Sequence, residues 1–346
     1  MEIAKYHLDS VDRDKWAQLT VSCPSTTPFC LLEWLELLEL GFPAWHVHFI
    51  VMEQDGRYMA GLPLIVSAAA GVRQSHSMAH GSPAGPVLDP DADPGLASAL
   101  LSWWADHYCA GWQAIRLSVT FSDEVAPGLD SLLSRDFHVE TQTAYRVTLH
   151  GRSYEQWEGA LSQQTRNKNR QAQERGGTFE RVESLELVPE LSRLSKLTAN
   201  RHGRDKIPYG EKIFRSLLDL NGPLRSNPGL ARVVMVRVDG RPAVYNLCLA
   251  YRGKMWLIDH GADSATFAAR PNNLIYSRII RDAFGEGIGE VDLGAVPPDA
   301  ESLAGFKQGL DGCPYQRKSA VRSNLSFRMA QKVGNMLKIR RGGRSK

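Results

Sequence analysis

Alternating apolar and polar residues predict two β-hairpins that lie far apart in the chain. Residues 45–66 form two alternating segments around the Asp-Gly pair at 55–56, and residues 231–250 form two more around the Asp-Gly pair at 239–240. Alternation places apolar side chains on one face of a strand, and Asp-Gly is a strong signal for a tight hairpin turn. The pattern therefore predicts two antiparallel hairpins of the same kind.

Each predicted hairpin has a helix before it, and a helix followed by a strand after it. The elements are helices at 28–40 and 96–108 and a strand at 113–119 in the first half, and helices at 211–220 and 272–284 and a strand at 289–293 in the second. We interpret the halves as two copies of one α+β unit, because the same order of elements recurs. The alternative is a pair of unrelated α/β domains.

The length supports the same division. A chain of 346 residues is long enough for two domains of ordinary size. We place an N-terminal domain at residues 1–150, a C-terminal domain at residues 151–326 and a basic C-terminal tail at residues 327–346. Between the halves, a polar and basic helix is predicted at residues 153–175.

Charge is distributed unevenly along the chain. The net charge is only +3, but residues 312–346 contain ten Lys and Arg and no Asp or Glu. A segment of this kind suits a polyanion such as nucleic acid. The alternatives are a solvated terminus and a terminal helix docked on the body of the protein.

Composition excludes several classes of protein. With 43% hydrophobic and 23% charged residues the chain is globular in type. Apolar runs are too short to cross a bilayer, and the N-terminus lacks the apolar core of a signal peptide. We therefore expect a cytoplasmic protein with no transmembrane segment. Five cysteines without a CxxC spacing, and His46 and His48 without a third ligand, favour neither a disulfide framework nor a metal site.

Candidate chemistry is concentrated in residues 255–316. The chain contains neither GxGxxG nor GxxxxGK[ST], which argues against a simple nucleotide-dependent dehydrogenase or kinase. One predicted strand ends at Asp259-His260-Gly261, the next ends at Asp292-Leu293-Gly294, and a long connection then leads to Phe306-Lys307.

This order of strand, Asp-Leu-Gly, loop and Phe-Lys resembles the Fem family of aminoacyl-tRNA-dependent transferases, which are built from two acetyltransferase-like (GNAT) halves. Further stretches occur in the family's order: PFCLLEWLELLELG, HGSPAGPVLDP, LSQQTRNKNRQAQERGG, the RHG at 201–203, and GKMWLIDHGAD before PNNLIYSRII. The resemblance implies an α+β fold with tandem GNAT-like domains, each a mixed, mostly antiparallel sheet flanked by helices.

The resemblance also implies a reaction. Fem enzymes transfer an activated aminoacyl group from aminoacyl-tRNA to an amine acceptor, with no bound cofactor, and Lys307 matches the lysine of their Phe-Lys motif. Attack of an amine on an ester creates an oxyanion, which a fixed ammonium stabilises more in the transition state than in the ground state. The alternative for Lys307 is a surface lysine that follows a buried Phe306.

A proton acceptor is harder to identify from sequence. His260 is the best-placed histidine, because it ends a strand next to Asp259 and histidine titrates near neutral pH. Adjacent strand residues point to opposite faces, so we do not expect Asp259 and His260 to form one dyad. A histidine with a purely structural hydrogen bond is the alternative.

The resemblance assigns binding roles to two groups of polar residues. Those expected to contact the acceptor lie just after the RHG motif and are Arg204, Lys206 and Tyr209. Those expected to contact tRNA lie on the predicted basic helix and are Arg166, Lys168, Arg170 and Arg175. Trp34 is followed by apolar residues and Glu36, where the member that acts on a murein precursor has a lysine, so the acceptor is expected to differ.

Two other functions remain open. The first is N-acyl transfer from acyl-CoA or an acyl-carrier protein, although the loop TFAARPNN lacks the glycines that cradle the CoA pyrophosphate in simple GNAT enzymes. The second is a noncatalytic module that binds nucleic acid through the basic tail. We expect a monomer, since two halves in one chain supply the pairing that single-domain relatives obtain by dimerising.

Overall fold

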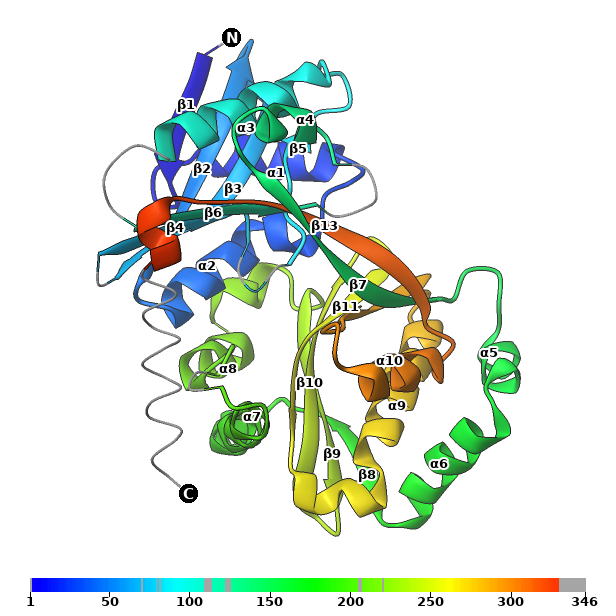
Figure 1. The fold of residues 1–346 in the computed structure, drawn as a ribbon. Coiled ribbons are helices and arrows are strands. Elements are labelled where there is room, and N and C mark those ends of the chain that lie inside the picture. Colours follow the sequence, from blue (N-terminus) through cyan, green and yellow to red (C-terminus); the bar gives the residue numbers. More distant parts are fainter. Residues whose placement is uncertain are drawn as a thin grey trace. The chain divides into compact units, whose positions relative to one another are not determined.

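The computed structural model places most of the chain. The residues that it describes are 2–69, 71–78, 80, 82–108, 114–121, 126–204, 207–219 and 221–329. They divide into two compact units (Figure 1). Unit 1 contains residues 1–141 and 317–346, and unit 2 contains residues 142–316.

Unit 1 is a twisted sheet flanked by helices. In spatial order its strands are β1 (Glu2–His7), β2 (Trp45–Gln54), β3 (Arg57–Ala69), β4 (Val72–His76), β6 (Ala114–Thr120) and the later part of β13 (Cys313–Ser323), with short β5 (Val87–Leu88) beside β3. Its helices are α1 (Arg13–Ser22), α2 (Leu32–Gly41), α3 (Gly95–Tyr108) and α4 (Leu129–Leu133). The strand pairs are antiparallel except β4 with β6, which is parallel.

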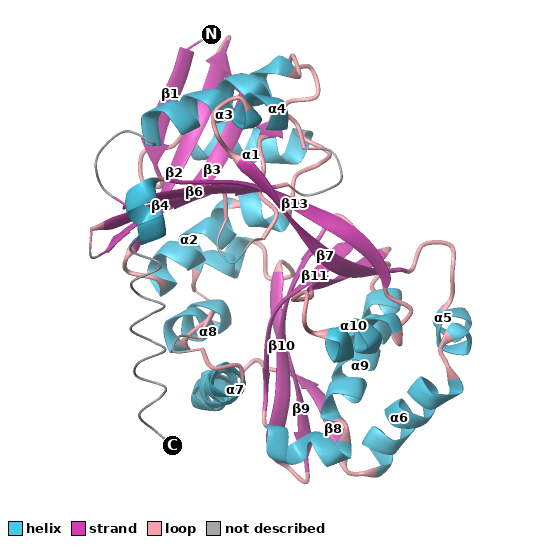
Figure 2. Ribbon diagram, in the orientation of Figure 1, coloured by secondary structure: helices cyan, strands magenta, loops and turns pink. Residues whose placement is uncertain are grey.

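Unit 2 repeats this plan (Figure 2). In spatial order its strands are β8 (Gly177–Arg181), β9 (Ala231–Val238), β10 (Arg241–Tyr251), β11 (Lys254–Ala262), β12 (Glu290–Ala295) and the later part of β7 (His138–Thr148). Its helices are α5 (Tyr154–Ala160), α6 (Gln163–Glu174), α7 (Val188–Arg201), α8 (Glu211–Leu218), α9 (Pro271–Gly285) and α10 (Glu301–Gln308). Here β11 and β12 form the parallel pair.

The predicted duplication is confirmed element by element. Strands β8, β9, β10, β11 and β12 occupy the places that β1, β2, β3, β4 and β6 have in unit 1. Both hairpins turn with two residues at positive φ, Asp55 and Gly56 in unit 1 and Asp239 and Gly240 in unit 2. Asp-Gly suits this turn because Gly adopts positive φ without steric cost and Asp tolerates it.

The last strand of each sheet comes from the other half of the sequence. Strand β13 pairs with β6 in unit 1, and β7 pairs with β12 in unit 2. The units therefore change over at 141–142 and 316–317, rather than at the expected 150–151 and 326–327. The difference arises because long-range strand pairing, and not local sequence pattern, sets these limits.

Each unit has its own hydrophobic core. In unit 2, α9 buries Leu274, Ile275 and Ile279 against the sheet, and Trp157 of α5 joins the same cluster. The predicted basic helix at 153–175 is interrupted at 161–162, so α6 is a separate helix with Ser162 as its N-cap. In the described part of the chain, no helix combines the length and the hydrophobicity needed to cross a membrane.

Candidate active site

The two parallel strands of unit 2 separate after a short run of pairing. Residues Lys254–Trp256 of β11 pair with Glu290–Asp292 of β12, and the register ends there. Beyond it, β11 continues beside β10 and β12 continues beside β7. We call the opening between residues 257–262 and 293–295 the fork. Where two strands part, the main-chain N–H and C=O groups on their facing edges no longer pair with each other and can bind a ligand instead.

Lys307 places its ammonium group at the fork. The residue lies in α10 and is only 3% exposed, and its Nζ donates to the carbonyl oxygens of Gly294 (2.9 Å) and Ala295 (3.2 Å). A Cβ added to Gly294 would lie 3.6 Å from the Leu257 carbonyl oxygen and 3.9 Å from Nζ, so the ammonium is near both edges of the fork. Lys307 is therefore not a surface lysine.

The Asp-Leu-Gly motif shapes the main chain that holds this ammonium. The Asp292 carboxylate is buried and accepts the Gly294 N–H at one oxygen and the Tyr315 hydroxyl at the other, both at 2.6 Å. Gly294 has φ +81°, a conformation that side chains other than glycine rarely adopt. The motif thus fixes a sharp bend that turns two carbonyl groups toward Lys307. Sequence reasoning recognised the motif but missed the part played by Tyr315.

One face of β10 and β11 packs against α7. A Cβ added to Gly261 would lie 2.9 Å from main-chain atoms of Leu194 and Ser195 in α7. On this face the buried Tyr245 donates a hydrogen bond of 2.5 Å to Oδ2 of Asp259. We call it the α7 face.

The opposite face packs against α9. His260 and Tyr276 have ring centroids 6.1 Å apart, and Tyr276 meets Phe306 edge-on at 5.2 Å. Asn246 opposes His260 in the strand register, so its side chain lies on the same side of the sheet. We call it the α9 face. Asp259 and His260 therefore point to opposite faces, as the alternation of a strand requires.

Burial makes ionisation of Asp259 less favourable. It raises the pKa of Asp259 to about 6, and the Tyr245 hydrogen bond and the charge of Arg204 act in the opposite direction. Burial also raises the pKa values of Tyr245 and Tyr209, and the Asp259 charge adds to both effects. The α7 face thus carries a carboxyl group that changes charge near neutral pH.

His260 has the opposite character. Burial lowers its pKa to about 4, and the positive charges of Arg201 and Lys307 lower it further. The imidazole is therefore neutral at pH 7. Its Nδ1 has no hydrogen-bond partner, and neither has Nδ2 of Asn246. Sequence reasoning missed Asn246, for which the only signal was a single amide in an otherwise apolar strand.

The corresponding opening in unit 1 is closed by its own chain. Strands β4 and β6 pair over five residues, and Ser77 then donates its N–H to the Ser118 carbonyl oxygen at 2.9 Å. The Thr120 N–H donates to Oγ of Ser77 at 3.1 Å, and Ala84 donates its N–H to the Thr120 carbonyl oxygen at 3.1 Å. Of the two units, unit 2 has the open fork.

Three of the four cations predicted to contact tRNA have partners within unit 2. Arg166 donates to the carbonyl oxygens of Gly159 (2.9 Å) and Leu161 (2.5 Å), at the end of α5. Arg170 forms an ion pair with Glu174 at 3.5 Å. Arg175 donates to the Ala268 carbonyl oxygen, and Lys168 is half-buried. Arg166 and Arg175 therefore hold main-chain segments of unit 2 together, whereas Arg170 is exposed.

Other predicted residues take varied positions. Tyr209 is buried and Arg204 is exposed, both close enough to Asp259 to affect ionisation on the α7 face. Lys206 lies outside the described residues, as does the basic tail from residue 330 onward. Within the described residues, no group of three or more His, Cys, Asp or Glu is arranged to bind a metal ion.

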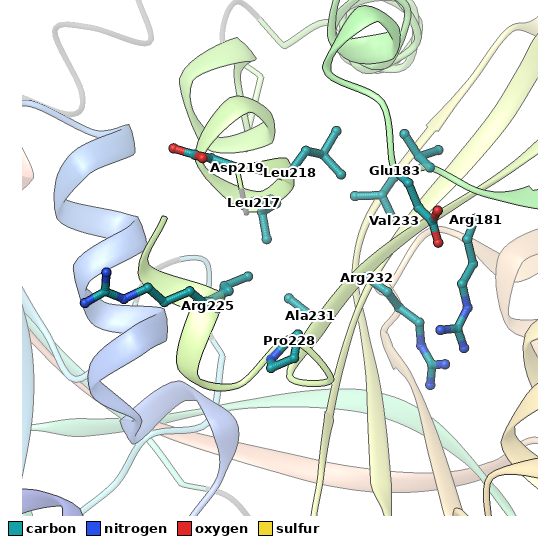
Figure 3. A pocket seen from close by; sticks show the side chains of 12 residues that line it. Arg181, Glu183, Leu217, Leu218, Asp219, Arg225, Pro228, Ala231, Arg232 and Val233 are labelled. Carbon is teal, nitrogen blue, oxygen red and sulfur yellow. The ribbon is translucent and has the colours of Figure 1, made fainter. Parts of the chain in front are cut away.

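A cavity of about 650 Å³ lies at the other edge of the unit 2 sheet (Figure 3). Its wall is formed by Leu217, Leu218 and Val233, together with other residues of α8, β8 and β9. Arg181 and Arg232 also line it, and both bind Glu286. Strand β10 separates β9 from the fork, and none of the predicted site residues lines the cavity. The candidate site is therefore the fork.

Comparisons with known proteins agree with this architecture. Residues 160–308 match the family model described as an acetyltransferase (GNAT) domain. No match was found among curated protein sequences. Similar solved structures include FemX, with 14% identity, a TM-score of 0.64, and coverage of 92% of this chain and 97% of that one.

Two further structures extend the likeness. A tandem GNAT protein from the clavulanic acid biosynthesis pathway has 12% identity, a TM-score of 0.61, and coverage of 93% of this chain and 98% of that one. The C-terminal domain of a putative lysylphosphatidylglycerol synthetase from Agrobacterium fabrum has 14% identity, a TM-score of 0.59, and coverage of 94% and 96%. The predicted tandem GNAT fold is confirmed, and the GNAT match supports an acyltransferase.

Proposed function

We propose that this chain, with its Fem-like tandem GNAT fold, is an N-acyltransferase that moves an aminoacyl group from the ester of aminoacyl-tRNA to an amine acceptor. The observation that carries the proposal is the buried ammonium of Lys307, held at the fork by the carbonyl groups of Gly294 and Ala295. A fixed cation inside an open sheet is suited to a reaction in which negative charge develops on oxygen.

The reaction has one anionic stage for Lys307 to stabilise. The acceptor nitrogen attacks the ester carbonyl carbon, and the carbonyl oxygen becomes an oxyanion. The nitrogen gives up a proton, the C–O bond to the ribose breaks, the amide forms, and the departing oxygen takes up a proton, so that no net proton is gained or lost. Because both oxygens gain negative charge, a nearby ammonium lowers the barrier more than it strengthens binding of the ester.

The two faces of the sheet suit the two substrates. We assign the acyl group to the α9 face, beside Lys307 and Phe306, and the acceptor amine to the α7 face, beside Asp259. A pKa of about 6 suits Asp259 as the proton acceptor, since a base works best near the operating pH. His260, with a pKa of about 4, is a weak base, and we assign it to binding the acyl group.

The start of α9 favours a donor other than CoA. Pro271 opens the helix and has no N–H, and the N–H groups of Asn273 and Leu274 both donate to the Arg270 carbonyl oxygen. Phosphates bind helix N-termini through free N–H groups. This first turn therefore offers little to a CoA pyrophosphate, whereas an aminoacyl ester needs no such cradle.

The acceptor would approach past the loop after α7. Tyr209 is buried with its hydroxyl close enough to feel the charge of Asp259, and Arg204 is an exposed cation in the same region. We propose that Arg204 and Lys206 bind an anionic part of the acceptor while Asp259 receives the proton of its amine.

We also propose that the protein acts as a monomer in the cytoplasm, where charged tRNA is available.

A donor panel with Lys307 variants tests the function. Charged tRNAs and acyl-CoAs are offered to the protein with a mixture of amines, with and without ribonuclease. We expect transfer only from charged tRNA, and a fall in kcat of about 10²–10³ for Lys307→Met, the cost of removing one oxyanion donor. Lys254→Met, which removes the half-exposed lysine at the start of β11, is the control.

Other results would select other functions. Transfer from acyl-CoA that resists ribonuclease would establish the CoA-dependent alternative, which the GNAT match favours. RNA binding without any transfer, unchanged in Lys307→Met, would establish the noncatalytic module. Equal turnover of wild type and Lys307→Met would remove Lys307 from the mechanism.

A further inference from the structure

Two polar atoms on the α9 face have no hydrogen-bond partner. Nδ2 of Asn246 and Nδ1 of His260 are both buried and unpaired, and the two residues oppose each other across β10 and β11. Asn246 is only 1% exposed. Opposed side chains in an antiparallel pair have Cβ atoms about 5 Å apart, so the two side chains can contact one small group.

Their surroundings make this arrangement unfavourable in the absence of a ligand. The same layer contains Val244, Cys248 and Ala262, all part of the hydrophobic core beneath α9. Leucine has as many side-chain heavy atoms as asparagine and branches at the same carbon, so it would remove the unpaired donor without leaving a cavity. Buried polar groups are almost always paired, and the exceptions call for an explanation such as a binding role.

In unit 1, the histidine on the corresponding strand has hydrogen-bond partners for both of its ring nitrogens. Strand β4 carries this half-buried histidine, His76, whose pKa burial lowers to about 4. Both ring nitrogens of His76 have partners, Ser118 Oγ at 2.6 Å and Gln74 Oε1 at 2.9 Å. The unpaired His260 is therefore not a general consequence of placing a histidine on such a strand.

We infer that Asn246 and His260 form a subsite for the α-amino acyl group of the donor, with Asn246 donating to the acyl carbonyl oxygen and His260 accepting from the α-amino group. The inference rests on the proposed function and extends it by naming the part of the donor that is recognised. The α-aminoacyl group presents an acceptor oxygen and a donor nitrogen two bonds from the carbonyl carbon. Simple acyl groups, such as acetyl or propionyl, present only the oxygen.

Nearby charge defines the form of the amine that binds. Lys307 and Arg201 both place positive charge close enough to His260 to lower its pKa. A second ammonium is therefore disfavoured, and the subsite takes the neutral amine, whose N–H points to an imidazole nitrogen that bears no proton. Binding should accordingly strengthen as pH rises through the pKa of the amine.

Two stable analogues of the charged 3′ end of tRNA test the subsite. The first is 3′-alanylamino-3′-deoxyadenosine, and the second is its 3′-propionylamino counterpart, which lacks the amine. Isothermal titration calorimetry at pH 8.5 should show that the wild-type protein binds the alanyl analogue about tenfold more tightly, the worth of one well-made hydrogen bond. Equal affinity for the two analogues, or binding of neither, would overturn the inference.

Single substitutions distinguish the role of His260 in binding from that of Asn246. His260→Phe should remove the preference for the alanyl analogue, whereas Asn246→Leu should weaken both analogues alike, because both carry the carbonyl oxygen. Cys248→Ala, two residues along the same face of β10, is the matched control and should keep the preference. A preference that survives in His260→Phe would also overturn the inference.

Activity distinguishes this inference from the proposed function. Loss of transfer from alanyl-tRNA in Lys307→Met, together with equal binding of both analogues, would support the function and reject the subsite. Selective binding of the alanyl analogue, without transfer from any charged tRNA, would support the subsite and reject the function.

Discussion

Replacing Tyr245 with Phe should move the pH dependence of the reaction upward. The Tyr245 hydroxyl donates to Asp259 at 2.5 Å, and this hydrogen bond is the largest of the effects that hold the pKa of Asp259 down against burial. Without it, the ionised carboxylate loses stability relative to the protonated carboxyl, and the pKa of Asp259 rises. Because we propose that ionised Asp259 accepts the proton, the variant should lose activity on the acidic side.

The size of the effect follows from the chemistry of the pair. A hydrogen bond to a charged group contributes about 1.5–3 kcal/mol, and each 1.36 kcal/mol changes a pKa by one. The pKa of Asp259, about 6 in the wild type, should therefore rise by about 1 to 2. At high pH both proteins have ionised Asp259, and their turnover should converge.

The assay is kcat/KM from pH 5 to 9 for the wild type, Tyr245→Phe and Tyr276→Phe. Tyr276 is a buried tyrosine on the opposite, α9 face, so its replacement should leave the profile unchanged. An unshifted profile in Tyr245→Phe would refute the reasoning, as would an equal shift in Tyr276→Phe.

The same carboxyl group affects stability with a defined sign. Its pKa is higher in the folded protein than in the unfolded chain, so the unfolded chain releases the proton first. The contribution of Asp259 to stability should therefore fall as pH rises from about 4 to about 6, and the difference in stability between the wild type and Asp259→Asn isolates it from the contributions of other titrating groups. Urea unfolding at pH 4.5 and pH 7.5 measures it.

Three further substitutions have expected outcomes. Gly294→Ala should destabilise the protein by about 1–3 kcal/mol in urea unfolding, because the φ of +81° at this position is strained for alanine. It should also lower kcat, because it displaces the carbonyl groups that hold Lys307. Asp292→Asn should lower kcat with little effect on KM, because a single amide cannot accept from both the Gly294 N–H and the Tyr315 hydroxyl at its two positions. Asn246→Leu should raise the melting temperature and the free energy of unfolding, by about 1 kcal/mol, while weakening donor binding.

Local pattern was sufficient to predict most elements of the fold. Strand alternation and the two Asp-Gly turns identified both hairpins, since these signals depend on residues that are neighbours in sequence. The exchange of β7 and β13 between units could not be predicted in this way. Strand β7 pairs with residues more than 140 positions later, and no short pattern specifies such a partner.

Sequence identified the central residues of the candidate site but not the contacts of the basic residues around it. The Phe-Lys motif pointed to Lys307, and strand alternation separated Asp259 from His260, as the structure has them. The roles of the basic residues on α6 were less accessible, because whether an arginine contacts a ligand or a neighbouring carbonyl group depends on tertiary packing. Arg166, for example, donates to two carbonyl oxygens at the end of α5.

The contrast between the two units suggests how a duplicated fold acquired one site. In both units a parallel strand pair lies inside an otherwise antiparallel sheet, and the chain must satisfy main-chain groups where that pair ends. Unit 1 does so with its own Ser77 and Ala84, which form hydrogen bonds with Ser118 and Thr120 of β6. Unit 2 uses the side chain of Lys307, whose ammonium group binds the carbonyl oxygens of Gly294 and Ala295. The positive charge of this group also acts on other groups nearby. The main-chain groups at the end of β12 thereby place a cation at the fork. His260, with its unpaired Nδ1, lies on β11 at the other edge of the fork, and Asn246, with its unpaired Nδ2, lies on the next strand, β10. Closing the unit 2 fork as unit 1 closes its own would leave no site there for the ester donor that we propose.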